Sequence, residues 1–153
     1  PSELSARAGR GRCSRLRGER HDLGAEGLLI NDCYNANPLS MRAALDYLSS
    51  LDRPQKVAVL GQMAELGPDA LRFHEEIGDY ARESGIDTIV SVGREADGYG
   101  AEVRVDTPSE AADWIRENLE PRGAVLVKGS RSAGLEAVQE SLEAAEMTHG
   151  PVN

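Results

Sequence analysis

Short apolar segments alternate with longer amphipathic segments along most of the chain, and this alternation limits the possible folds more than any other feature. The apolar segments have consecutive hydrophobic residues, as strands buried on both faces of a parallel sheet do. They span residues 28–30, 56–60, 88–92, 102–105 and 124–127, and helical patterns span residues 38–50, 69–84, 109–119 and 133–145. Repeated strand–helix units predict an α/β fold, a doubly wound, mostly parallel sheet with helices on both faces.

Local signals mark several helix ends. Asn37 before Pro38 fits an N-cap followed by proline at the first helical position. Thr107 and Glu110 are spaced as a capping box. Gly85 follows an amphipathic segment, as a C-terminal stop should. We therefore expect the helices to begin and end near these residues.

The chain of 153 residues is long enough to bury one core, and no internal linker or repeat divides it. We expect one domain over residues 15–146, with residues 1–14 as a tail or a linker from a preceding domain and residues 147–153 as a C-terminal tail. Residues 17–23 are expected to add an edge strand.

Composition excludes several classes of protein. The net charge of −9 argues against a nucleic-acid binder, which needs a basic surface, and the arginines of the first twenty residues fit a solvated arm. No apolar run approaches the roughly 18 residues of a membrane span or resembles a signal peptide. The two cysteines form neither a disulfide framework nor a metal-site pattern, so we expect a reducing, cytoplasmic environment.

Three polar segments follow predicted strands, at residues 31–38, 61–67 and 128–132. In doubly wound sheets, ligands bind beyond the carboxyl ends of the strands. Lys128, Ser130, Arg131 and Ser132 at a helix start favour an anion such as a carboxylate or a phosphate. Simple N-capping by Ser130 or Ser132 explains the same residues equally well. Asp32 can accept hydrogen bonds from ribose hydroxyls, although its spacing alone favours turn formation.

Several catalytic patterns are absent from the sequence. It has no P-loop, no G-x-G-x-x-G after a strand and no nucleophile elbow, and its three histidines are far apart. His74, beside Phe73 in a predicted helix, is expected to be structural. Cys33 is expected to be a small buried residue rather than a reactive thiol. We therefore predict no catalytic residue and no metal site within this chain alone.

Three motifs nevertheless resemble those of a known family. Residues 29–41 resemble the D-D-S-Y-N-A-N-P-x-S-M motif of the Mur ligases that add D-alanyl-D-alanine to the peptidoglycan precursor. Residues 59–67 are similar to V-L-G-D-M-x-E-L-G, and His74 and Gly78 fit the H-x-x-x-G that follows it. Residues 125–133 match V-L-V-K-G-S-R-S-A. The motifs stand in the family's order and together are specific.

The resemblance implies a Rossmann-like third domain of a three-domain ligase, with the N-terminal and central domains as its partners. The central domain of such ligases holds the P-loop, ATP and Mg²⁺, and the third closes over ATP and brings the amino substrate. The implied reaction joins D-alanyl-D-alanine to UDP-N-acetylmuramoyl-tripeptide through an acyl phosphate. By itself this chain is expected to be inactive.

The resemblance also implies residue roles. Arg17 and Asp32 are expected to contact the nucleotide, and Asn37 to line the same site; Arg12 is the alternative to Arg17. We expect a second group of residues near the carboxylate of the dipeptide, namely Lys128, Ser130 and Arg131.

The chain departs from the family pattern at three positions. Asn31 replaces the first Asp of its motif, Cys33 replaces Ser, and Gln62 replaces Asp. Asn31 and Cys33 leave Asp32 unchanged, so we expect the nucleotide contact to survive, whereas Gln62 removes a charge from its loop.

Two other functions stay open: a sister ligase with another amino substrate, and a stand-alone nucleotide-binding module.

Overall fold

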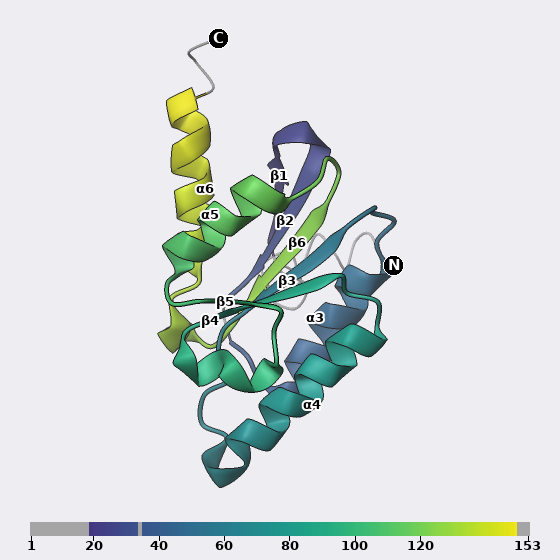
Figure 1. Cartoon of the computed structure of the whole chain (residues 1–153), viewed down its shortest axis with the longest axis vertical. Helices are drawn as coiled ribbons and strands as arrows, with labels where there is room; N and C mark the ends of the chain where they lie inside the picture. Colours follow the sequence, from purple (N-terminus) through teal and green to yellow (C-terminus); the bar gives the residue numbers. More distant parts are fainter. Residues whose placement is uncertain (1–18, 34, 150–153) are drawn as a thin grey trace, which may run out of the picture.

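A six-stranded sheet with the order β1-β2-β6-β3-β4-β5 forms the centre of the protein (Figure 1). The computed structural model describes residues 19–33 and 35–149, with side chains up to residue 144. The strands are β1 Glu19–Leu23, β2 Gly27–Asp32, β3 Lys56–Leu60, β4 Thr88–Val92, β5 Val103–Val105 and β6 Ala124–Lys128. β1 pairs antiparallel with β2, and all other neighbours are parallel. The predicted doubly wound, mostly parallel sheet is confirmed, including the edge strand.

Helices cover both faces of the sheet. The α-helices are α3 Pro38–Ser50, α4 Ala70–Glu83, α5 Pro108–Asn118 and α6 Glu136–His149, and the 3₁₀ helices are η1 Gly24–Glu26, η2 Gly67–Asp69, η3 Arg94–Tyr99 and η4 Arg131–Ala133. Figure 1 places α3 and α4 on one face and α5 and α6 on the other. Each pair encloses its own apolar cluster, one around Leu45 and Ile77 and the other around Ile115 and Val138.

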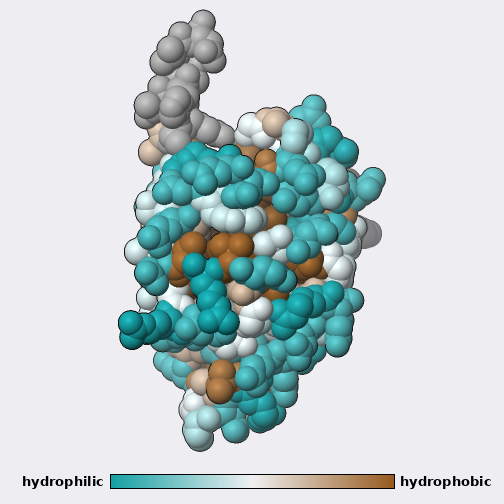
Figure 2. All heavy atoms as spheres, in the orientation of Figure 1, coloured by the Kyte–Doolittle hydropathy of each residue, from teal (hydrophilic) through white to brown (hydrophobic). Residues whose placement is uncertain are grey.

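The outer surface shown in Figure 2 is mostly hydrophilic. Figure 2 shows a face covered mostly by hydrophilic side chains, with hydrophobic atoms gathered near its middle. Among the described residues, no helix combines the length and the apolar character that crossing a bilayer requires.

The predicted caps of α3 and α5 are confirmed. The Asn37 side chain accepts a hydrogen bond from the Ser40 N–H at 2.8 Å, and Ser40 Oγ accepts one from the Asn37 N–H at 3.1 Å. Thr107 and Glu110 form the equivalent box at α5. These side chains satisfy amide groups that a helix start leaves without partners. The start of α3 is thereby fixed next to the carboxyl end of β2.

The segment after β6 differs from the prediction. We expected a helix from residue 133, directly after the polar residues 128–132, but α6 begins at Glu136. Gly134 adopts φ +67°, a left-handed conformation that favours glycine, and ends the short η4 helix. Neither Ser130 nor Ser132 therefore caps α6, and Ser130 makes no side-chain capping bond to η4, so the simple capping explanation is wrong. The anion site at this segment stays a prediction.

Candidate functional site

The last strand of the chain lies between two earlier strands, and this order creates the site. β6 pairs with both β2 and β3, so Lys128 is level with Asp32 on one side and with Leu60 on the other. The chain order of the parallel strands reverses here, and such switch points are where ligands bind in open α/β sheets. The three polar segments predicted from the sequence meet at this edge.

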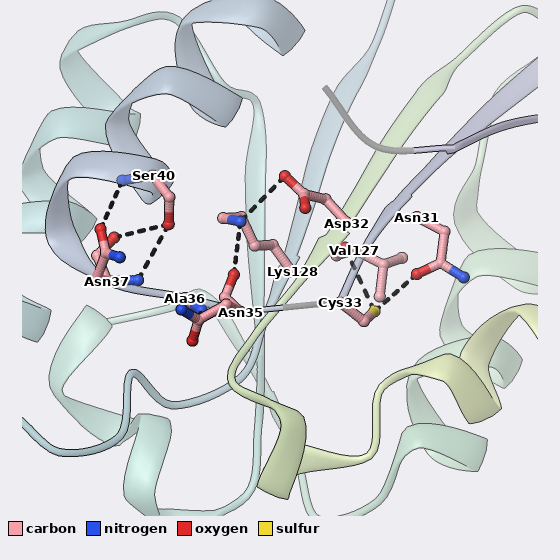
Figure 3. A network of polar contacts seen from close by, with 9 residues as sticks. All are labelled: Asn31, Asp32, Cys33, Asn35, Ala36, Asn37, Ser40, Val127 and Lys128. Atoms are coloured by element: carbon pink, nitrogen blue, oxygen red, sulfur yellow. Dashed lines mark hydrogen bonds and ion pairs between the residues drawn. The ribbon is translucent and has the colours of Figure 1, made fainter. Parts of the chain in front are cut away.

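A buried ion pair joins β2 to β6 (Figure 3). Lys128 Nζ lies 3.0 Å from Asp32 Oδ2 and donates a second hydrogen bond to the backbone oxygen of Asn35 at 2.8 Å. Both charged side chains are only 3% exposed. Charges removed so fully from water persist because they are paired and hydrogen-bonded.

The carboxyl group of Asp32 feels two opposing effects. Burial raises its pKa above the ordinary value, and the ammonium of Lys128, by its charge and its hydrogen bond, opposes that rise. Lys128 contacts Oδ2, and no described residue donates a hydrogen bond to Oδ1. The second oxygen of Asp32 is therefore an acceptor that a ligand hydroxyl can use.

The ends of β3 and β6 are joined by backbone hydrogen bonds. The Gly61 N–H donates to the Lys128 oxygen at 2.9 Å, and the Ser130 N–H donates to the Gln62 oxygen at 2.8 Å. A Cβ atom on Gly129 would lie 2.9 Å from Gly61 Cα, so only glycine permits this approach. The second and third polar segments thus form one packed unit.

Two aromatic side chains hold the backbone of this unit through hydrogen bonds. Tyr99 donates from its hydroxyl to the Gly61 oxygen at 2.8 Å. His74 accepts from the Met63 N–H through Nε2 at 3.0 Å, and its Nδ1 contacts the Ala70 oxygen at 2.6 Å. The prediction of a structural His74 is confirmed. Tyr99 could not be predicted from the sequence, because nothing in a glycine-broken segment indicates a contact 38 residues away along the chain.

The remaining predicted site residues occupy different positions. Asn37 is exposed and caps α3, Ser130 is buried with its Oγ 3.0 Å from Ser132 Oγ, and Arg131 is exposed. Arg17 and its alternative Arg12 lie outside the described residues. The sequence also missed the Asn35 oxygen, since a backbone carbonyl leaves no trace in a motif.

Two of the three departures from the family pattern face away from the ion pair. Cys33 Sγ donates to Asn31 Oδ1 at 2.7 Å, and Asn31 Nδ2 donates to Gln139 on α6, on the opposite face of the sheet from Lys128 (Figure 3). Burial, which is the largest effect, raises the pKa of the Cys33 thiol to about 12, and nearby carboxylates add to the rise. The predicted burial of Cys33 is confirmed.

The third departure stays within the packed unit. Gln62 Nε2 donates to Ser132 Oγ at 3.4 Å. An aspartate here could only accept, so Gln62 replaces an acceptor with a donor. Among the side chains that the structure describes, within residues 19–33 and 35–144, no group of three His, Cys, Asp or Glu side chains is placed to hold a metal ion.

Comparison with known families decides the relationship. The family model described as "Mur ligase, glutamate ligase domain" matches residues 12–131, more than half of the chain. The chain belongs to the Mur ligase family. Asp32 and Lys128 both fall within the matched range.

Two curated relatives in the Mur ligase family carry the same name. The chain is 36% identical over 122 residues to the UDP-N-acetylmuramoyl-tripeptide–D-alanyl-D-alanine ligase of Escherichia coli (strain K12), covering 76% of this chain and 27% of that protein. It is 38% identical over 145 residues to the ligase of the same name from Mycobacterium tuberculosis (strain CDC 1551 / Oshkosh), covering 76% and 28%. The chain thus spans about a quarter of the length of these curated relatives.

Solved Mur ligase structures share the fold. The MurF ligase of Thermotoga maritima in complex with ADP superposes with a TM-score of 0.75 at 25% identity, covering 92% of this chain and 36% of that one. MurF of Acinetobacter baumannii gives 0.72 at 30% identity, covering 84% and 31%. A domain of a putative ligase from Haemophilus ducreyi gives 0.58 at 14% identity, covering 85% and 98%. This last similarity concerns the fold alone.

Proposed function

We propose that this chain is the C-terminal domain of an ATP-dependent ligase that adds D-alanyl-D-alanine to UDP-N-acetylmuramoyl-tripeptide. The observation that most strongly supports this proposal is the buried Asp32–Lys128 pair at the switch point of the sheet, within segments that match the family. The two curated relatives described above carry the name of this activity. The free, buried thiol of Cys33 fits a reducing cytoplasm as the place of action.

The nucleotide is assigned to the β2 side of the site. Asp32 Oδ1, to which no residue in the described part of the chain donates, can accept hydrogen bonds from ribose hydroxyls, and the exposed Asn37 lies one short loop away at the start of α3. Arg17 completes this proposed group. ATP supplies the phosphoryl group that activates the tripeptide carboxylate. The family resemblance assigns Mg²⁺ mainly to the other domains of the ligase.

The amino substrate is assigned to the segment after β6. Ser130 and Arg131 offer a hydroxyl group and a guanidinium group, which suit the carboxylate of a dipeptide. The resemblance adds Lys128 to this group, although its ammonium is directed at Asp32 and Asn35. This domain then contributes positioning and closure over the reactants rather than a reacting group.

Phosphate release by the full-length ligase that carries this chain tests the proposal. The assay contains ATP, Mg²⁺ and UDP-N-acetylmuramoyl-tripeptide, with a panel of amino substrates. We expect release that depends on D-alanyl-D-alanine. Release with another amine would replace the dipeptide ligase by a sister ligase. Release with none would leave a nucleotide-binding module.

A matched pair of variants tests the role of Asp32. Asp32→Asn keeps the shape but loses the negative charge, so we expect the KM for ATP to rise at least about tenfold, equivalent to ~1.4 kcal/mol of binding. Asp106→Asn is the control, since Asp106 is exposed and follows β5 at the opposite edge of the sheet. Equal KM values for ATP in both variants would remove Asp32 from the nucleotide site.

A further inference from the structure

The surroundings of Lys128 do not fit direct contact with a substrate. Its side chain is 3% exposed, although it ends at the edge of the sheet. A lysine ammonium has three N–H donors, and here Asp32 and Asn35 accept from two of them. A ligand carboxylate would therefore have to compete with Asp32 for this ammonium. Arg131, in the same segment, has an exposed side chain.

The two acceptors of Lys128 belong to the nucleotide side of the site. Asp32 is the last residue of β2, and Asn35 lies in the loop that leads from β2 to the cap of α3 at Asn37. Lys128 contacts Oδ2, and Oδ1 has no hydrogen-bond donor among the described residues. By contacting the Asn35 oxygen, Lys128 also holds the loop that carries Asn37.

We infer that Lys128 is a positioning residue for the nucleotide and not a ligand of the amino substrate. It orients the carboxylate of Asp32 and fixes the loop before α3, so that Asp32 and Asn37, the two groups that face the nucleotide, keep their relative positions. A neighbouring cation also keeps a buried carboxyl group ionised, and an ionised carboxylate accepts stronger hydrogen bonds from hydroxyls. This inference rests on the proposed function, because it assigns one residue to one of the two substrates.

The split between two Michaelis constants in the full-length ligase tests the inference. Lys128→Met keeps the length of the side chain and removes its charge. We expect the KM for ATP to rise about tenfold or more and the KM for D-alanyl-D-alanine to stay within about twofold. Arg131→Met in the same segment is the contrasting variant, with the opposite pattern. A rise in the dipeptide KM with Lys128→Met would overturn the inference.

A double variant keeps the test valid if Lys128→Met alone fails to fold. Asp32→Asn/Lys128→Met removes both charges, so neither is left buried without a partner. If Lys128 acts only through Asp32 and the loop, the double variant has the same dipeptide KM as Asp32→Asn. An additional rise in the dipeptide KM would show direct contact and would refute the inference. Lys128→Arg, which retains a cation, should recover part of the ATP affinity.

A measurement without catalysis separates this inference from the proposed function. Urea unfolding of the 153-residue chain is compared for Asp32→Asn, Lys128→Met and the double variant. We expect strong non-additivity, with the double variant more stable than the sum of the single losses predicts. Additive losses would overturn the pairing whether or not the ligase is active. An inactive parent ligase together with non-additive losses would instead reject only the proposed function and the substrate assignment that rests on it.

Discussion

Replacing Gly129 with alanine tests whether the close packing of the β3 and β6 ends holds this edge of the sheet together. The new Cβ would lie 2.9 Å from Gly61 Cα and 3.1 Å from Gly61 N, both backbone atoms. Carbon atoms pack best at about 3.5–4.0 Å, so the backbone at Gly61 must move by roughly 0.6–1.1 Å. The third close contact, with Leu135 Cδ1 at 2.9 Å, can be relieved by a change in that side chain.

The expected cost follows from this displacement. Overpacking in a tight interior costs about 1–3 kcal/mol, and each weakened backbone hydrogen bond adds about 0.5–1.5 kcal/mol. Two such bonds, from the Gly61 and Ser130 N–H groups, flank the contact. We expect Gly129→Ala to lower the free energy of unfolding by ~2–4 kcal/mol. For a domain of this size, that corresponds to a fall in Tm of roughly 5–15 °C.

Urea unfolding of the chain, followed by far-ultraviolet circular dichroism, measures the effect. The midpoint should fall while the slope with urea stays unchanged, because the same surface is exposed on unfolding. Gly24→Ala is the matched control, since its Cβ would meet no atom within 4 Å. The control should stay within about 0.5 kcal/mol of the unmodified chain or become slightly more stable. A loss below ~0.5 kcal/mol for Gly129→Ala would refute the reasoning.

Three further predictions concern single side chains. Asn37→Ala and Thr107→Ala each remove a capping box, so each should lower the free energy of unfolding by ~1 kcal/mol in thermal melts. Only Asn37→Ala should also raise the KM for ATP. If both variants change that KM equally, the role of Asn37 is capping alone. Burial raises the pKa of Cys33 from 9.0 to about 12, so between these pH values the folded state keeps a thiol proton that the unfolded chain loses. The contribution of this thiol to the free energy of unfolding is therefore fully present below pH 9 and is lost as pH rises towards 12. In a Cys13→Ser background, thiol labelling at pH 8 should be no faster than unfolding, and rapid labelling would contradict the burial. His74→Ala removes a buried ring with two hydrogen-bond partners and should cost ~2–4 kcal/mol in urea unfolding, whereas a loss under ~1 kcal/mol would show that the ring is dispensable.

Much of the fold could be predicted because its signals are local. Buried strands such as β3 are continuously apolar, and the caps at Asn37 and Thr107 lie within four residues of the groups they satisfy. The start of α6 was predicted wrongly because the local helical pattern begins before the helix itself does. Its helical pattern extends back to residue 133, but Gly134 takes a left-handed conformation and Leu135 turns into the core, 1% exposed. Packing against the sheet outweighed the local preference.

The site itself was only partly predictable. The motifs identified Asp32 and Lys128 as polar residues at strand ends, but they assigned the two side chains to different substrates. Their contact spans 96 residues along the chain and exists because β6 pairs between β2 and β3. Strand order depends on how whole helices and strands pack, which no short segment specifies. The sequence alone therefore determined the elements and the chemistry at their ends, and the tertiary structure decided that the two charges meet, buried, as one pair.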